Sequence, residues 1–316
     1  VSESPVGRPT GPQPLWALGA DALTRQAQAR RISVAKVPWQ DMPCGRVSLI
    51  ITRGHRAVLG GVGMLKIDDL HLSFGGIKAL RGVSFTAQPG QITGVIGPNG
   101  AGKTSLFNAI SGFYTPDQGR VSFEGRDMTG LSPDKRAALG MARTFQNIAL
   151  FRGMSVLDNI KLGAHTRLDT NLWQALRYFG RARADELALR RDIEERVIDF
   201  LEIDHIRKLP ITMLPYGLQK RVELGRALAM QPRVLMLDEP VAGMNQEEPA
   251  DMARFILDVQ EQFGTTILLV EHDMHMVMDI CAHVVVRNFG QQIAEGTPAE
   301  ISSNDAVIEA YLGAAA

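Results

Sequence analysis

One stretch of the chain carries the residue types that are needed to hold a polyphosphate. It has the spacing G-x-x-x-x-G-K-T and consists of Gly97, Pro98, Asn99, Gly100, Ala101, Gly102, Lys103 and Thr104. In such a loop the glycines let backbone N–H groups surround phosphate oxygens, the lysine reaches the β- and γ-phosphates, and the threonine hydroxyl binds Mg²⁺. We therefore predict a nucleotide site in which Lys103 and the backbone amides up to that of Ser105 bind phosphate and Thr104 binds the metal.

Two carboxylates and a histidine lie further along the chain, at the ends of apolar segments. Asp238 and Glu239 close one short apolar run, and His272 follows another. Such runs are typical of buried parallel strands, whose carboxyl ends meet at the edge where open α/β sheets bind ligands. Asp238 is thus a candidate Mg²⁺ ligand, and Glu239 is a candidate general base for the attacking water. His272 could contact the γ-phosphate and Gln146 could contact Mg²⁺ or the water, although chemistry alone allows each a structural role.

The elements that must position these residues follow from the apolar pattern. The apolar run 92–96 predicts the strand before the loop, and residues 105–110 predict the helix after it. Alternating apolar residues within 67–85 and at 121–123 predict a small antiparallel sheet beside the nucleotide core. Phe74 closes one of these strands, where it could stack on an adenine ring or serve as a core residue.

The chain divides into segments of different character. Residues 1–63 hold six prolines and no sustained period, so we expect a mostly disordered leader or an upstream extension, with a docking arm as the alternative. The remainder, 64–316, reads as an α/β nucleotide-binding domain. Its core comprises 64–145 and 226–316, and residues 146–225 form an inserted helical subdomain. Within that insertion Ile193, Val197 and Leu201 fall four apart, which predicts an amphipathic helix.

The composition restricts the class of protein. Of the 316 residues, 45% are hydrophobic and 22% charged, which is typical of a globular chain. Lys+Arg and Asp+Glu balance at 34 each, so no overall charge favours nucleic acid, and we expect no such partner. Cys44 and Cys281 lack metal-binding spacing, and no signal peptide or run of roughly 18 apolar residues is evident. We therefore expect a cytosolic location in a reducing compartment, with a membrane partner left open.

Six segments in order resemble the ATPase subunit of an ABC transporter. They are residues 97–104, Gln146, 214–221, 237–240, 242–245 and His272. The resemblance covers about Leu65 to Gly313. It implies that two such subunits sandwich two ATP molecules, each site pairing the phosphate loop of one subunit with the signature segment of the other. It also implies that Gln146 and His272 respond to the γ-phosphate and that Phe74 stacks on adenine.

The signature segment departs from the family pattern. The usual order is Leu-Ser-Gly-Gly-Gln, whereas this chain has Leu214, Pro215, Tyr216, Gly217 and Leu218, followed by Gln219. The serine hydroxyl that would contact the partner's γ-phosphate is therefore absent. The helix that opens near Gly217 can still direct its N-terminus at phosphate. The segment would thus offer the partner's site a helix N-terminus without a serine hydroxyl.

Finer features resemble the subgroup of bacterial importers for branched-chain amino acids. These are the Tyr216 variant of the signature, the segment 242–245 and the ending 307–313. The resemblance implies a second ATPase subunit in a heterodimer or homodimer, membrane permease subunits, a periplasmic binding protein and a peripheral position on the cytoplasmic face of the inner membrane. Importers of urea, short amides or other small solutes look much alike, so the solute stays open.

Two further questions stay open at this level. Ile148, Leu150 and Phe151 could line a groove for a permease helix or belong to the core. A soluble ATPase of the same superfamily, acting in DNA repair or translation, is a rival, as is a regulatory subunit with little hydrolysis. The single phosphate loop and the lack of sustained heptads disfavour the first rival, and an intact Glu239 disfavours the second.

Overall fold

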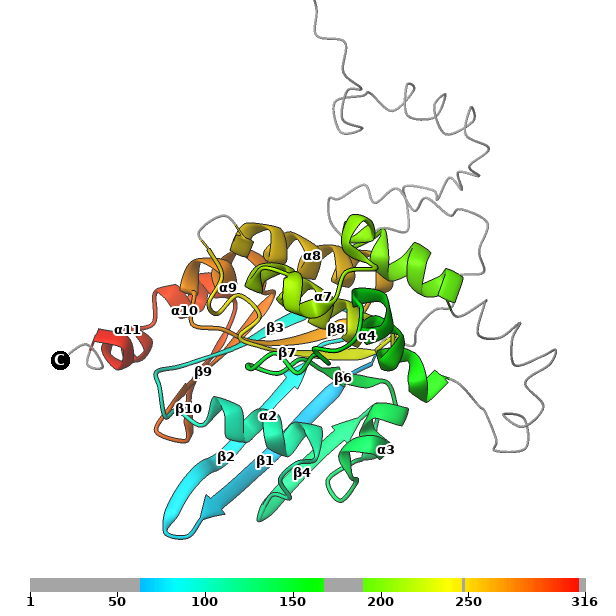
Figure 1. Ribbon diagram of the computed structural model, residues 1–316. Helices are drawn as coiled ribbons and strands as arrows, with labels where there is room; N and C mark the ends of the chain where they lie inside the picture. The colour runs from blue at the N-terminus through cyan, green and yellow to red at the C-terminus, as the bar shows by residue number, and fades with distance from the viewer. Residues whose placement is uncertain (1–62, 168–189, 246–247, 313–316) are drawn as a thin grey trace, which may run out of the picture. The chain divides into compact units, whose positions relative to one another are not determined.

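The computed structural model describes residues 63–167, 190–245 and 248–312, which are coloured in Figure 1. By internal packing the chain divides between Leu59 and Gly60. The predicted leader thus lies outside the described residues, apart from Gly63, and the described strands and helices all belong to the unit that begins at Gly60.

The centre of this unit is a six-stranded sheet in the order β10-β9-β3-β8-β7-β6. All its neighbouring strands run parallel except β10, which is antiparallel to β9. The strands are β3 (Ile92–Ile96), β6 (Met141–Arg143), β7 (Val234–Asp238), β8 (Thr266–Val270), β9 (His283–Asn288) and β10 (Gln291–Gly296). Every residue of β3, β7 and β8 is buried, because the sheet is covered on both faces.

A smaller sheet is antiparallel, in the order β2-β1-β4-β5. It comprises β1 (Leu65–Phe74), β2 (Ile77–Ala87), β4 (Gln118–Phe123) and β5 (Arg126–Asp127). Its buried side chains pack against α2 (Lys103–Ser111) and one face of the six-stranded sheet. The predicted flanking sheet is confirmed. The helix that follows the phosphate loop, α2, packs in one hydrophobic core with residues of both sheets (Figure 1).

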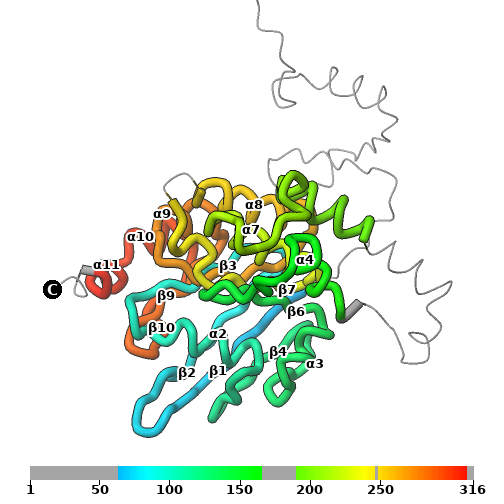
Figure 2. Tube along the Cα trace, in the orientation of Figure 1, coloured from blue at the N-terminus to red at the C-terminus, as the bar shows by residue number. Residues whose placement is uncertain are grey.

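Helices cover the other face of the six-stranded sheet. They include α4 (Val156–Gly163), α7 (Tyr216–Leu228), α8 (Glu248–Phe263) and α9 (Met274–Ile280). Their apolar residues form one core with the strands, and α4 packs against α7 (Figure 2). The architecture is therefore the mixed α/β fold that the sequence predicts, with an antiparallel sheet on one face and helices on the other.

The remaining helical elements are short. They are α3 (Pro133–Ala138), η3 (Ala164–Arg167), the π-helical turn η4 (Glu194–Ile198), η5 (Asp204–Ile206), η6 (Ile211–Met213), α10 (Pro298–Ser302) and α11 (Asp305–Leu312). Ile193, Val197 and Leu201 are all buried, as the four-residue spacing predicts, although the helix passes into a π-turn at Glu194 and ends there. No helix in the described parts of the chain combines the length and the apolar character that crossing a membrane requires.

Candidate nucleotide site

The phosphate loop has a backbone that only glycine can adopt at two positions. Gly97 and Gly102 have φ values of 150° and 85°. A Cβ on Gly97 would lie 2.1 Å from the carbonyl oxygen of Arg287, and a Cβ on Gly102 would lie 2.4 Å from that of Ala79. The loop is thus pressed against β9 and β2, and α2 begins directly after it at Lys103. This close packing fixes the loop amides at the N-terminus of a helix, where anions bind.

Lys103 is held inside this loop. Its side chain is buried, and its Nζ donates to the carbonyl oxygens of Gly97 at 2.6 Å and Pro98 at 3.1 Å. Burial lowers the pKa of Lys103, while the nearby Glu239 carboxylate acts in the opposite direction. The ammonium group therefore lies at the phosphate loop with only backbone carbonyls as its hydrogen-bond partners among the described residues.

A pocket joins the loop to residues from distant parts of the chain. Its lining includes residues 99–105 together with Gln146, Glu239 and His272. Ile77 of β2 and Phe289 of the β9–β10 turn also line it. The residues predicted separately from the phosphate loop and from the strand ends therefore share one pocket. None of residues 214–219 belongs to its lining.

Glu239 is held from two sides at this pocket. Its Oε2 accepts a hydrogen bond of 2.8 Å from Gln146 Nε2, and its Oε1 lies 2.8 Å from His272 Nε2. The Glu239 side chain is 13% exposed, and its φ of 48° is unusual for a residue with a Cβ. Non-glycine residues in this region of φ occur at functional sites, where the surrounding structure holds them in place. The three side chains that sequence reasoning singled out thus form one hydrogen-bonded group.

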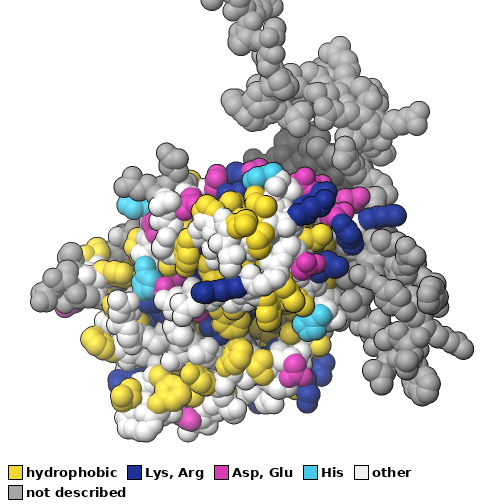
Figure 3. Space-filling view, in the orientation of Figure 1, with side chains coloured by type: hydrophobic (Ala, Val, Ile, Leu, Met, Phe, Trp, Pro, Cys, Tyr) yellow, Lys and Arg dark blue, Asp and Glu magenta, His cyan; other side chains and the backbone are white. Residues whose placement is uncertain are grey.

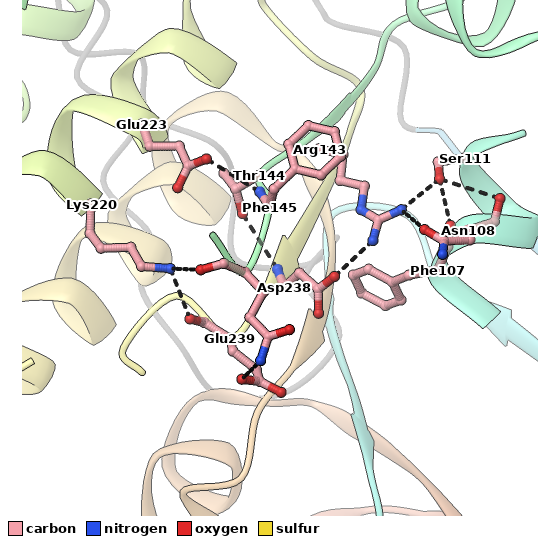
Figure 4. Close-up of polar contacts among 11 residues, drawn as sticks. Phe107, Asn108, Ser111, Arg143, Thr144, Phe145, Lys220, Glu223, Asp238 and Glu239 are labelled. Carbon is pink, nitrogen blue, oxygen red and sulfur yellow. Dashed lines mark hydrogen bonds and ion pairs between the residues drawn. The ribbon is translucent and has the colours of Figure 1, made fainter. Parts of the chain in front are cut away.

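Asp238 lies at the end of β7 and is almost fully buried. Its Oδ2 accepts from Arg143 Nη2 at 2.7 Å, and its backbone N–H lies 3.4 Å from Thr144 Oγ1. Figure 4 shows the guanidinium of Arg143 between Asp238 and residues of α2. Sequence reasoning did not identify Arg143 or this ion pair.

Lys220 is a second residue that sequence reasoning missed. Its Nζ donates to the carbonyl oxygens of Gln146 at 2.9 Å and Glu239 at 3.3 Å (Figure 4). The side chain is buried, and burial lowers the pKa of Lys220. Helical spacing was the available signal, because Lys220 shares the buried face of α7 with Gly217 and Leu224. A lysine on a buried face needs a specific partner.

Glu271 is a third residue that sequence reasoning missed. Its Oε1 accepts from the backbone N–H of Val241 at 2.9 Å, and its Oε2 accepts from that of His272 at 3.0 Å. Burial raises the pKa of Glu271. This carboxylate joins the chain after Glu239 to the start of the His272 segment, so it supports the two residues that meet at the pocket.

The signature segment occupies a different place. Leu214 is buried and accepts a hydrogen bond of 2.8 Å from Gln219 Nε2, Pro215 precedes α7, and Tyr216 is 42% exposed. A Cβ on Gly217 would lie 2.2 Å from Glu248 Oε1, so this position has no room for a larger residue without movement of Glu248. Leu218 packs partly against the core. The segment thus presents the first turn of α7 outside this chain's own pocket.

Phe74 lies at the margin of the pocket without lining it. Its ring packs edge-on against Tyr114, with 5.1 Å between ring centroids. Phe74 pairs across the hairpin with Ile77, and Ile77 does line the pocket. Phe289 lines it as well; this residue is 78% exposed and has a φ of 44°. Stacking of Phe74 on adenine stays a prediction.

Comparisons with known proteins identify the family of the chain. The family model "ABC transporter" matches residues 80–242, and the model "Branched-chain amino acid ATP-binding cassette transporter" matches residues 291–316. The high-affinity branched-chain amino acid transport ATP-binding protein BraF of Pseudomonas aeruginosa is 39% identical over 255 residues, covering 80% of this chain and 98% of that protein. The corresponding protein LivG of Escherichia coli is 39% identical over 259 residues, with the same shares.

Solved structures give the same result for the fold. A nucleotide-free ATP-binding cassette from an ABC transporter has a TM-score of 0.68 and 32% identity, covering 79% of this chain and 98% of that one. The ADP conformation of an ATP-binding cassette also scores 0.68 with 32% identity, over 79% and 99% of the two chains.

Proposed function

Because the chain belongs to the ABC transporter family of ATP-binding subunits, we propose that it hydrolyses ATP to power a membrane importer of branched-chain amino acids. The observation that carries the catalytic part is the pocket in which Gln146 and His272 hold Glu239 beside the phosphate loop. The substrate class is supported by the names of the relatives and by the second family model at residues 291–316.

The donor atoms at the pocket suit Mg²⁺ with a nucleotide. A hydroxyl from Thr104, a carboxylate from Asp238 and an amide oxygen from Gln146 are hard oxygen ligands of the kind that Mg²⁺ takes. Thr104 and Gln146 line the pocket, and Asp238 directly precedes Glu239 in the chain. Mg²⁺, when bound, would neutralise charge on the β- and γ-phosphates. Lys103 and the loop amides would hold those phosphates.

Glu239 would act as the general base. Each of its oxygens has one hydrogen-bond partner, Gln146 or His272, and so keeps a lone pair that can accept from a water molecule. A carboxylate that holds a water beside the γ-phosphate can orient it and take its proton. His272 and Gln146 would fix the direction of the carboxylate, and Lys220 would support both segments through their backbone oxygens.

The signature segment, residues 214–219, would act at the site of a second ATPase subunit. Tyr216 is exposed, and the free N–H groups of the first turn of α7 can face an anion. Pro215 offers no hydroxyl for this contact. A heterodimer with a different ATPase subunit is the proposed assembly, and a homodimer is the alternative.

The permease subunits would bind near the start of α4. Phe151, Met154 and Leu209 are exposed there, and a bridge between Ser155 and Pro210 brings their segments together. Figure 3 shows hydrophobic side chains exposed over α4 and α7. Leu150 packs partly against the core, so only part of the predicted groove is free. Through these permeases the chain would lie peripherally on the cytoplasmic face of the membrane and serve a periplasmic binding protein.

The test is uptake of labelled leucine in cells that lack this gene and receive either the intact chain or Glu239→Gln. We expect uptake to return only with the intact chain, which would support the importer class, the substrate and the general base together. If cells that lack the gene take up leucine as well as cells that have it, the substrate assignment would be overturned. Urea and short amides would then be measured in the same cells. Restored uptake with Glu239→Gln would instead overturn the assignment of the base.

A further inference from the structure

Arg143 stands out among the polar residues around the pocket because it is a buried cation bonded to a carboxylate of the site. It ends β6, and its Nη2 lies 2.7 Å from Asp238 Oδ2. The two side chains are only 8% and 4% exposed. Water therefore screens this pair weakly, and the geometry of the carboxylate is set by the guanidinium.

The same guanidinium also holds the helix that follows the phosphate loop. Its Nη1 donates to Asn108 Oδ1 at 2.7 Å and to Ser111 Oγ at 2.8 Å, and both acceptors lie on α2 (Figure 4). Thr104 is the second residue of this helix. Arg143 thus joins the element that carries the Thr104 hydroxyl to the strand end that carries the Asp238 carboxylate.

Aromatic rings surround the guanidinium. Its central carbon lies 5.5 Å from the ring centre of Phe107, 6.0 Å from that of Phe113 and 5.2 Å from that of Phe145. These distances are in the range of cation–π contacts, which favour arginine because its planar group can stack on rings while it donates in its own plane. Phe145 directly precedes Gln146, so the position of Arg143 is also coupled to the third predicted Mg²⁺ residue.

A buried ion pair by itself says little about stability, because apolar residues of similar volume often stabilise a core equally well. Its use must lie in the geometry that it imposes. The two terminal nitrogens of one rigid guanidinium hold Asp238 and α2 at a fixed separation. The other oxygen of the Asp238 carboxylate, Oδ1, receives no hydrogen bond from Arg143. That oxygen is the one left to bind Mg²⁺ or a Mg²⁺-bound water.

We propose that Arg143 is a positioning residue for Mg²⁺, which holds the carboxylate of Asp238 and the helix of Thr104 in the arrangement that a Mg²⁺–nucleotide complex requires. The proposal rests on the proposed function, in which Thr104 and Asp238 take Mg²⁺. Partners of this kind, which hold metal ligands without touching the metal, typically change metal affinity by about 10- to 100-fold when they are replaced.

The chain offers a matched control in Arg136. This arginine is 1% exposed and also bonds α2, through the carbonyl oxygens of Ala109 and Ile110, and its other acceptors are the carbonyl oxygens of Thr129 and Leu131. Among the described residues it makes no hydrogen bond or ion pair with Asp238. Its replacement therefore measures the effect of losing a buried arginine without losing a contact to Asp238.

The experiment measures ATP affinity by calorimetry, in EDTA and in excess Mg²⁺, for the full chain and for Arg143→Lys, Arg136→Lys and Asp238→Asn, with a melting temperature for each. A lysine keeps the charge but cannot reach both Asp238 and α2 with a planar fork. We expect Arg143→Lys to bind ATP normally in EDTA. The increase in ATP affinity that Mg²⁺ causes should be on the order of 10-fold smaller in this variant than in the intact chain. Arg136→Lys should lower the melting temperature and keep the full Mg²⁺ effect.

A normal Mg²⁺ effect in Arg143→Lys, together with its loss in Asp238→Asn, would overturn the positioning role alone. A normal Mg²⁺ effect in Asp238→Asn would instead overturn the Mg²⁺ assignment in the proposed function. An equal loss in Arg136→Lys would reduce Arg143 to a general structural role. If Arg143→Lys does not fold, Asn108→Ala combined with Ser111→Ala removes the acceptors on α2, and the same decrease in the Mg²⁺ effect is expected from it.

Discussion

The pocket and the signature segment are both proposed to bind phosphate, but they differ in how many of the residues needed for catalysis come from this one chain. At the pocket, residues from six separate segments already meet, and Glu239 bonds Gln146 and His272. The signature segment, residues 214–219, lines no part of that pocket and presents an exposed tyrosine at the start of α7. Under the proposed function, one region is thus a nearly complete hydrolytic site, whereas the other would be half of a site that a second subunit completes.

This difference has an experimental consequence. Substitutions at the pocket should change the behaviour of the isolated chain or the chemistry of its own bound ATP. Substitutions in the signature segment should not change ATP binding by the isolated chain. Their effect on ATP turnover should be seen only in the assembled complex. The following changes test that division, from the largest expected effect to the smallest.

Glu239→Gln should have the largest effect. An amide cannot accept the proton of the attacking water, so turnover by the assembled complex should fall by about 100-fold or more. ATP binding by the isolated chain should be unchanged, since the phosphates are held by Lys103 and the loop amides. Phosphate release and calorimetry measure the two quantities. Turnover at the level of the intact protein would mean that another group acts as the base.

Pro215→Ser should act in the assembled complex alone. A hydroxyl at this position can donate to the partner's γ-phosphate, and a hydrogen bond to a charged group contributes about 1.5–3 kcal/mol, so a rise in turnover of about 10-fold is expected. The affinity of the isolated chain for ATP should not change. An altered affinity in the isolated chain would contradict the separation of the two regions, because none of residues 214–219 lines its pocket.

Phe74→Ala should have the smallest effect, and it tests which residue at the margin of the pocket contacts adenine. Loss of stacking on adenine should weaken ATP binding by about fivefold, in keeping with about 1 kcal/mol for an aromatic pair. Binding of inorganic tripolyphosphate should stay the same, because it has no base. Phe289→Ala is the companion variant, since Phe289 lines the pocket and is 78% exposed. If only Phe289→Ala weakens ATP binding, the adenine contact lies at the β9–β10 turn and not at Phe74.

Several parts of this molecule follow from the sequence alone. The phosphate loop could be predicted because its chemistry lies in consecutive residues, whose glycines dictate a backbone with φ of 150° at Gly97 and 85° at Gly102. Asp238 and Glu239 could be predicted because a wholly apolar run before two carboxylates is typical of a buried parallel strand, and every residue of β7 is indeed buried.

Only the tertiary structure decided which side chains touch. Gln146 lies 93 residues from Glu239, and Arg143 lies 95 residues from Asp238. These contacts exist because β7 lies between β8 and β6 in the sheet, an order that does not follow the chain. Local patterns report whether a residue is buried and which way it faces, but they do not report the neighbours of a strand. The sequence by itself therefore determined the types of group at the site, and strand order determined the pairs that they form.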